Sequence, residues 1–337
     1  MKGGDTMENE KDVASEVATA ASVSSSGEEI RGSEESGTTE ENPLVYRKRK
    51  RRLGDRRDGR KLHTIQPMHR VMPYIMPKRS DALNTFYDRL EVSRVDELCR
   101  RKIREGKMHF SALHVLLAAY LRTISQRPGI NRFISGQKVF ARNEIVFVMT
   151  VKKELSLNAP ETLIKVKFNP ADTLDEVYEK FNKTAQEAIA SMDKPTDFDK
   201  LSKILSIIPG QLLRFVVFIL RCLDYIGHLP KTILNLSPFH GSMIITSMGS
   251  LGINPIYHHI YDFGNLPVFI SYGTKNVCYE YDRKGVLCRK YMDVKVVTDE
   301  RICDGHYFAS AFKYFKKLIE HPDLLEKRPD KVIEDIE

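Results

Sequence analysis

The sequence predicts an α/β (α+β) domain that follows a polar tail. Two observations carry this prediction. From residue 63 onward, segments with the two-residue alternation of β-strands exchange with segments in which apolar residues recur every three or four positions, as in α-helices. In addition, 42% of the 337 residues are hydrophobic, which is enough for a sizeable core.

The first part of this domain contains both kinds of segment. Helical periodicity predicts helices over residues 67–76, 95–106, 109–128 and 173–192. Alternating β-branched and aromatic residues predict β structure over residues 82–93, 138–153 and 161–170. The helix at 173–192 has the clearest start, because Thr173 stands as an N-cap with Glu176 three residues later, which is a capping box.

The second part begins with two helical stretches after Pro195, and the later one, residues 207–230, is the most hydrophobic part of the chain. Strand patterns then cover residues 242–253, 266–281 and 286–298, and an amphipathic helix is expected over residues 306–321. The predicted domain therefore extends over residues 63–337.

The most apolar stretch allows several interpretations. Residues 204–220 are nearly long enough to cross a bilayer, which takes about 20 apolar residues. Arg214 and the break at Pro209 and Gly210 argue against a spanning helix. A helix over residues 204–226 that lies on a membrane surface is an alternative. We favour a buried helix or an oligomer contact.

The region before the domain, residues 1–62, is predicted to be a disordered tail that is first acidic and then basic. Its first part is rich in Glu, Ser, Thr and Gly and nearly free of large apolar residues. The basic run at residues 47–61 is expected to stay solvated or to bind an anionic partner, with an anionic membrane surface as one possibility. Nucleic acid is a weaker candidate, because no RNA- or DNA-binding motif accompanies the run.

The cysteines indicate a reducing, cytoplasmic setting. Five are present, without CxxC pairs, without metal-ligand spacing to histidines, and without a signal peptide before them. No metal site is expected. The glycine-rich loops that hold nucleotide phosphates are also absent from the sequence, so nucleotide-driven chemistry has no support.

Four segments resemble one family of enzymes. ERICDGHYFASAFKYFKKLIEHPDLL, residues 300–325, resembles the HxxxDG signature and following helix of the catalytic domain of 2-oxo acid dehydrogenase dihydrolipoamide acyltransferases and of chloramphenicol acetyltransferases. Residues 110–145 are similar to the family's helix, turn and hairpin, residues 173–189 to its central helix, and MIITSMGSLGI at 243–253 to its TISNLGxxG strand. The four segments stand in the family's order.

This resemblance implies a chloramphenicol acetyltransferase-like mixed sheet flanked by helices, and homotrimers with active sites at subunit interfaces. Coenzyme A or an acyl-coenzyme A would be a substrate there, meeting an acceptor in a channel. In the family the motif histidine deprotonates the acceptor, and a hydroxyl on the TIS strand donates a hydrogen bond to the tetrahedral intermediate. The resemblance assigns the hydroxyl to Ser247, the motif Asp-Gly to Asp304 and Gly305, and the histidine's position to Glu300.

Glu300 in place of histidine leaves two functions open. An ordinary glutamate, with a pKa near ~4.3, is a weaker base than histidine by about two units, or roughly 3 kcal/mol of driving force for proton transfer. Burial and the nearby Asp304 could raise its pKa and make it a tuned base of a coenzyme A-dependent acyltransferase. Alternatively, Glu300 is solvated or ion-paired in a pseudoenzyme, a non-catalytic trimeric scaffold or thioester-binding module.

The remaining candidate residues support the site in different ways. Asp304 is a candidate catalytic carboxylate, but we favour a structural role, because carboxylates near helix N-termini are stabilising without catalysis. In the family this aspartate pairs with an arginine, and Arg70 or Arg301 could serve here. His258 and His259 follow the Ser247 strand and could supply a replacement imidazole. Gly305 is expected to allow a tight turn against the sheet.

The sequence also departs from the family. The region before residue 63 is too short and too polar for the lipoyl and peripheral-subunit-binding domains of the large family members. The helical stretch at about residues 200–236 is longer than the family's equivalent, and we expect it to reshape the channel or the trimer contact.

Overall fold

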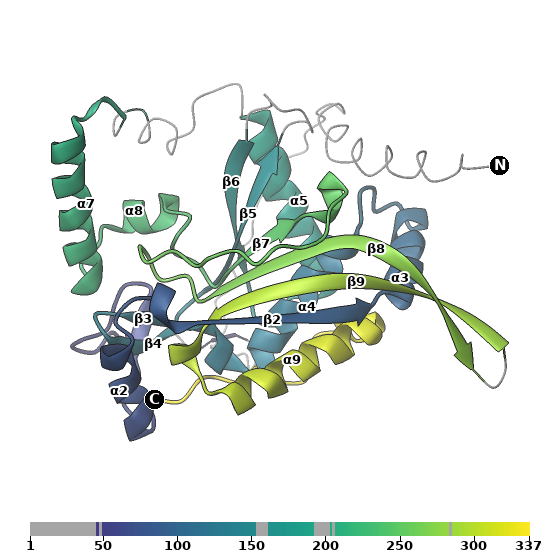
Figure 1. Ribbon diagram of the computed structural model, residues 1–337, viewed down its shortest axis with the longest axis horizontal. Coiled ribbons are helices and arrows are strands. Elements are labelled where there is room, and N and C mark those ends of the chain that lie inside the picture. The colour runs from purple at the N-terminus through teal and green to yellow at the C-terminus, as the bar shows by residue number, and fades with distance from the viewer. Residues whose placement is uncertain (1–44, 47–48, 153–160, 192–202, 204–205, 283–284) are drawn as a thin grey trace, which may run out of the picture.

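A computed structural model describes residues 45–46, 49–152, 161–191, 203, 206–282 and 285–337 (Figure 1). The predicted disorder of residues 1–44, 47 and 48 lies outside the described residues. Residues 200–202 and 204–205 of the expected extra helical segment also lie outside the described residues.

A six-stranded mixed sheet, here called the main sheet, forms the centre of the molecule, as expected for an α/β fold. The strand order is β2-β9-β8-β7-β5-β6. Strand β7 runs parallel to β5 and β8, and the other neighbours are antiparallel. The strands are β2 (Leu83–Glu91), β5 (Ile145–Lys152), β6 (Glu161–Phe168), β7 (Met243–Ser247), β8 (Val268–Asp282) and β9 (Gly285–Asp299).

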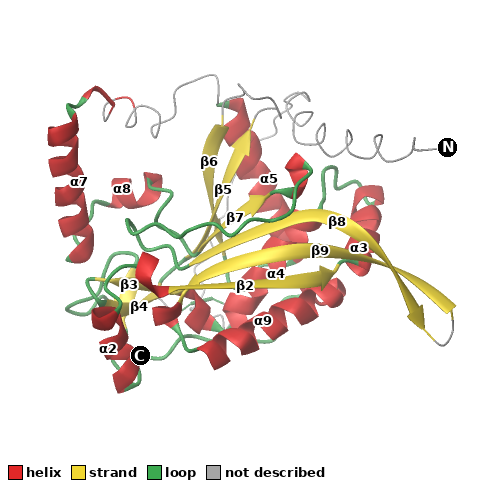
Figure 2. Cartoon of the chain, viewed as in Figure 1, coloured by secondary structure: helices red, strands yellow, loops and turns green. Residues whose placement is uncertain are grey.

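Helices cover one face of the main sheet (Figure 2). The long buried face of α4 belongs to a core cluster that also includes the inner residues of the strands. Helix α5 begins at the predicted capping box, where Thr173 N donates to Glu176 Oε2 at 2.8 Å. The helices are α2 (Pro67–Ile75), α3 (Ser93–Arg104), α4 (Ala112–Gln126), α5 (Leu174–Ala190), α7 (Gly210–Tyr225), α8 (Lys231–Leu236) and α9 (Gly305–Glu320).

A second, three-stranded sheet, here called the small sheet, shows where the expected tail ends. It consists of β1 (Gly59–Lys61), β4 (Lys138–Arg142) and β3 (Arg132–Ser135), with β1 antiparallel to β4. Because β1 comes from the basic run, residues 49–62 belong to the folded domain and not to a disordered tail. We call residues 49–61 the basic segment.

We expected helix α7 to be a buried helix or an oligomer contact, and within the single chain it is not buried. It stands at the edge of the molecule, apart from the helices on the main sheet (Figure 1). Leu212, Phe215 and Phe218 are more than half exposed, at 53%, 59% and 59%. The residue of α7 that is buried is Asp224, in its last turn. Within the described part of the chain, no helix combines the length and apolar character that crossing a membrane requires.

Candidate functional site

The acidic turn between β9 and α9, residues 299–304, is built around a carboxylate that the sequence did not single out for this role. Asp299 ends β9 with 1% of its surface exposed. Arg301 donates two hydrogen bonds to it, from Nε to Oδ1 at 2.8 Å and from Nη2 to Oδ2 at 2.7 Å. Arg79 adds Nε at 3.3 Å from Oδ2. Asp299 is therefore enclosed by two guanidinium groups.

These arginines also fasten the acidic turn to distant segments. Arg79 donates to the main-chain oxygens of Tyr261 and Gly264, at 2.7 and 3.0 Å. Arg301 donates to the oxygen of Met76, beyond the end of α2, at 2.8 Å. Burial lowers the pKa of Arg79, although the charge of Asp299 opposes this. The cluster fixes the shape of the turn without placing a base in it.

Glu300, the residue at the position of the family's histidine, is exposed. It begins the short 3₁₀ helix η5 (Glu300–Ile302). Within the described residues its side chain has no hydrogen bond and no ion pair. The Glu300 carboxylate therefore faces solvent in the single chain.

Asp304 caps α9 instead of pairing with an arginine. Its Oδ1 accepts a hydrogen bond from Tyr307 N at 2.7 Å, which satisfies one free donor of the helix N-terminus. Neither expected partner reaches it, since Arg301 is committed to Asp299 and Arg70 donates to a main-chain oxygen. The expected arginine pair is therefore wrong, and a stabilising role at the helix start takes its place.

Gly305 is not required for close packing. It is the first residue of α9, and a Cβ added there would meet nothing within 4 Å. Its φ angle also lies outside the left-handed region that favours glycine. The expectation of a tight turn against the sheet is therefore wrong for this residue.

Ser247 lies at the end of β7, far from the acidic turn. In the sheet register, Ser247 pairs with Tyr272 of β8, and Tyr272 pairs with Val294 of β9. Val294 precedes Glu300 by six residues, which corresponds to roughly 20 Å at ~3.3 Å per strand residue. One chain therefore does not bring Ser247 and Glu300 together.

The surroundings of Ser247 leave its hydroxyl near solvent. Its Oγ accepts a hydrogen bond from Ser250 N at 3.3 Å, and the residue is half-buried. Burial raises the pKa of Tyr272 to about 12, a shift that a hydrogen bond with Ser247 partly opposes. This hydroxyl is positioned at a strand end, between Ser250 and Tyr272.

His258 and His259 lie in the loop before β8. The half-buried His258 ring stacks on Phe269 with centroids 4.2 Å apart, and its Nδ1 is 3.0 Å from the oxygen of His259. Phe269 is level with Val297, three residues before Glu300. His258 therefore lies closer to the acidic turn than Ser247 does, whereas the His259 side chain is exposed.

A cavity of about 260 Å³ opens beside the acidic turn, lined in part by His69, Cys303, Asp304 and Tyr307. Burial raises the pKa of Cys303 to about 12, so this thiol stays protonated at neutral pH. The Tyr307 hydroxyl accepts a hydrogen bond from Gly129 N at 2.9 Å and keeps its proton to donate. Sequence reasoning missed His69 and Tyr307 as cavity residues, because no motif links residue 69 to the turn.

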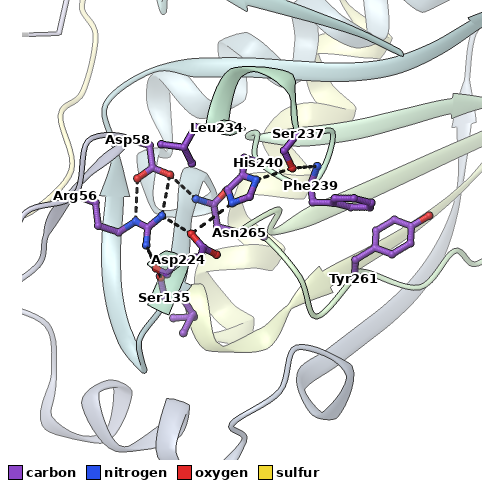
Figure 3. Close-up of polar contacts among 12 residues, drawn as sticks. Arg56, Asp58, Ser135, Asp224, Leu234, Ser237, Phe239, His240, Tyr261 and Asn265 are labelled. Atoms are coloured by element: carbon purple, nitrogen blue, oxygen red, sulfur yellow. Dashed lines mark hydrogen bonds and ion pairs between the residues drawn. The ribbon is translucent and has the colours of Figure 1, made fainter. Parts of the chain in front are cut away.

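A second polar cluster lies between the basic segment, the end of α7 and the loop before β7 (Figure 3). Arg56 joins Asp58, with Nε to Oδ1 at 2.9 Å, and Asp224, with Nη2 to Oδ1 at 2.7 Å. His240 Nε2 is 3.4 Å from Asp224 Oδ1, and its Nδ1 is 2.8 Å from Ser237 Oγ. Burial opposes ionisation of Asp224, but His240 and Arg56 outweigh it and lower the pKa of Asp224 to about 2.

The side chains of Ser237, His240 and Asp224 are arranged like an acid–base relay, but they are buried away from solvent. Ser237 and His240 are 7% and 3% exposed, so substrate has no access to the hydroxyl. Arg56, which we expected to be solvated as part of the basic run, is 3% exposed. We therefore interpret the cluster as a buried junction that holds the basic segment and α7 to the domain.

Comparisons with known proteins find structural likeness alone. No protein-family model and no curated protein matches the chain. A probable dihydrolipoamide acetyltransferase from Listeria monocytogenes matches 82% of this chain and 99% of its own, with 12% identity and a TM-score of 0.49. A truncated catalytic core of the 2-oxoacid dehydrogenase multienzyme complex from Thermoplasma acidophilum matches 78% and 99%, with 15% identity and a TM-score of 0.46. A chloramphenicol acetyltransferase matches 71% and 88%, with 14% identity and a TM-score of 0.43.

Proposed function

We propose that this chain is a coenzyme A-dependent acyltransferase whose active site forms between two copies of the chain. The observation that carries the proposal is the sheet register, which separates Ser247 and Glu300 by about 20 Å within one chain. Both side chains are accessible at their respective ends of the sheet. A homotrimer, as the family resemblance implies, would bring the Glu300 end of one copy to the Ser247 end of the next.

The proposed chemistry uses both residues at the interface. Glu300 accepts the proton of the acceptor thiol, and the thiolate attacks the carbonyl carbon of the acyl thioester. Ser247 donates a hydrogen bond to the oxyanion that develops on that carbonyl oxygen. The intermediate then breaks its bond to the sulfur of coenzyme A, which leaves as a thiol with the proton held by Glu300.

The interface would also supply the burial that Glu300 lacks in the single chain. Covering the carboxyl with a second copy raises its pKa, because burial disfavours the charged form. A reducing cytoplasm, which the cysteine pattern predicts, would keep the acceptor thiol reduced. The alternative function, a non-catalytic scaffold or thioester-binding module of the same fold, is favoured by the exposed and unpartnered state of Glu300 among the described residues.

Titration and turnover separate these two functions. Coenzyme A and acetyl-coenzyme A are titrated by calorimetry against the wild-type chain and its Glu300→Ala and Glu300→His variants, with transfer to a dithiol acceptor followed in parallel. The acyltransferase proposal expects wild-type turnover that falls at least tenfold in the alanine variant and returns in the histidine variant. Thioester binding without turnover in any variant supports the binding module. Absence of binding throughout leaves a scaffold.

The partner of α7 is a separate part of the proposal. We propose that its exposed stripe of Leu212, Phe215 and Phe218, flanked by Arg214 and Arg221, rests on an anionic membrane surface. Co-sedimentation with vesicles containing phosphatidylserine tests this. Binding should fall in a Phe215→Ser, Phe218→Ser variant, while binding that is unchanged by these substitutions contradicts the proposal.

A further inference from the structure

A large cavity lies beside the basic segment, away from the residues discussed for acyl transfer. Its volume is about 770 Å³, within the range of small-molecule sites. The walls come from the basic segment, the turn between β4 and β5, and residues 334–337. Eight lysine and arginine side chains line it, against five aspartate and glutamate side chains, so the cavity carries an excess of positive charge.

Some of these cations are already neutralised. Arg49 contacts the carboxylates of Glu334 and Glu337 at 2.5 Å each. Arg56 is held by Asp58 and Asp224 in the buried junction. The positive excess therefore resides on the other lining residues.

Arg142 is the central unneutralised group. Its Nη2 donates to the main-chain and side-chain oxygens of Asn265, both at 2.9 Å, and its guanidinium lies 4.4 Å from the centre of the Phe133 ring. Its Nε is buried without a hydrogen-bond partner. Among the described residues, no carboxylate lies within ion-pair distance of it. Burial lowers the pKa of Arg142 to about 10, and the nearby charges of Arg56 and Arg79 act in the same direction.

Three further cations stand at the rim. The side chains of Lys50, Arg52 and Lys61 form no hydrogen bond or ion pair with the described residues, although all three line the cavity. Lys61 projects from the same face of the small sheet as Arg142, because Lys61 pairs with Phe140 and residues two apart share a face. Positive charge is thus spread along the cavity instead of concentrated at one point.

The buried junction next to the cavity is also short of negative charge. Arg56, Arg142 and Lys165 bring three positive charges, whereas Asp58 and Asp224 bring two negative ones. Lys165 donates to two main-chain oxygens, and burial lowers its pKa to about 8. Buried charge without a counter-charge is costly, and an anion beside Arg142, which lines the cavity, would offset part of this cost.

We propose that this cavity binds a small molecule carrying two or more phosphate groups. Arg142 lines the cavity, and among the described residues no carboxylate forms an ion pair with it, so its guanidinium is a positive charge that a phosphate can compensate. Lys50, Arg52 and Lys61 then contact the outer phosphates. The cavity is larger than a single phosphate requires, which leaves space for an organic group. This site is independent of acyl transfer, because recognition of phosphates requires no thioester.

Calorimetric titration of the full chain with inorganic pyrophosphate and with ADP tests the proposal. Saturable binding with one molecule per chain is expected for both probes. Arg142→Gln should weaken binding at least tenfold. The double variant Arg52→Gln, Lys61→Gln, here called the rim variant, should weaken it about tenfold. Arg57→Gln is the matched control, because Arg57 is an exposed arginine of the same segment that does not line the cavity. Affinity in this control should stay within about twofold of the wild type.

Several results would overturn the proposal. One is the absence of saturable binding by either probe. Another is an equal loss of affinity in Arg57→Gln and in the rim variant, since this would indicate nonspecific attraction to a basic surface. A third is Arg142-dependent binding of vesicles containing a phosphorylated lipid when neither soluble probe binds. Arg142→Gln is first checked for a cooperative thermal transition, and the rim variant provides the decision if that substitution unfolds the chain.

Discussion

The basic segment and the acidic turn have opposite charge and the same construction. In the basic segment, Arg56 is buried between Asp58 and Asp224, whereas in the acidic turn Asp299 is buried between Arg79 and Arg301. Each buried charge takes a partner far away in the sequence. In each place one adjacent residue of the same charge, Arg57 beside Arg56 and Glu300 beside Asp299, is exposed. The comparison teaches that a run of like charges can contain both buried structural members and exposed ones.

The two clusters differ in what else they contain. The junction around Arg56 includes a buried histidine, His240, and holds the exposed helix α7. The cluster around Asp299 contains no histidine and holds the turn that leads into α9. We therefore expect the first cluster to respond to pH near neutrality and the second to be insensitive there.

The largest effect is expected from breaking the cluster around Asp299. Asp299→Asn leaves two buried guanidinium groups without a counter-charge and should lower the free energy of unfolding by about 3–5 kcal/mol. Glu300→Gln, one residue later and exposed, should change it by at most about 0.5 kcal/mol. Urea unfolding measures both. Equal effects of the two substitutions would show that the burial difference does not govern stability here.

A smaller loss is expected in the other cluster. Asp224→Asn should cost about 2–3 kcal/mol, because Arg56 loses one carboxylate but keeps Asp58. Amide hydrogen exchange should also become faster in α7, which Asp224 holds to the domain. Arg221→Gln on the exposed side of α7 is the control and should change neither quantity. Unchanged exchange in α7 after Asp224→Asn would refute the anchoring role.

The pH dependence distinguishes the clusters further. Burial lowers the pKa of His240, although Asp224 opposes this shift. The unfolded chain therefore takes up a proton near pH ~6.5 before the folded chain does, and the stability that His240 contributes is lost as pH falls below that value. Hydrogen exchange in α7 should rise between pH 7 and 5 relative to a His240→Gln variant, while exchange around Asp299 should show no such difference. The opposite sign of the pH dependence would contradict this assignment.

The smallest effects are expected at the start of α9. Asp304→Ala removes the helix cap and should cost about 1 kcal/mol. Gly305→Ala should be neutral or stabilise by up to about 1 kcal/mol, because the added methyl group meets open space and restricts the unfolded chain. Thermal unfolding of both variants measures this. A loss above about 2 kcal/mol for Gly305→Ala would restore the tight-turn interpretation.

Local patterns made much of the fold predictable. The capping box at Thr173 and Glu176 correctly marked the start of α5, and the alternation of residues 286–298 correctly indicated β9. Both signals lie within a few neighbouring residues. The mixed sheet flanked by helices was also predicted, through motifs spread over most of the domain.

The site was less predictable, because its interactions join residues that are distant in sequence. Nothing near Asp299 indicates that Arg79, 220 residues away, will pair with it. Arg56 likewise meets Asp224 across 168 residues, so its burial could not be inferred from a basic run. The sequence also aligned Ser247 and Glu300 with one family site, whereas the sheet register places them apart in one chain.

The most direct test of an active site between two copies is complementation between two inactive variants. A Ser247→Ala chain retains Glu300, and a Glu300→Gln chain retains Ser247. In randomly mixed trimers, roughly a quarter of the sites should combine the intact Glu300 of one chain with the intact Ser247 of its neighbour. The proposal predicts acyl transfer in the co-expressed mixture at roughly that fraction of the wild-type rate, well above either variant alone. Activity no higher than that of the single variants, in a mixture shown by mass spectrometry to contain mixed oligomers, would contradict it.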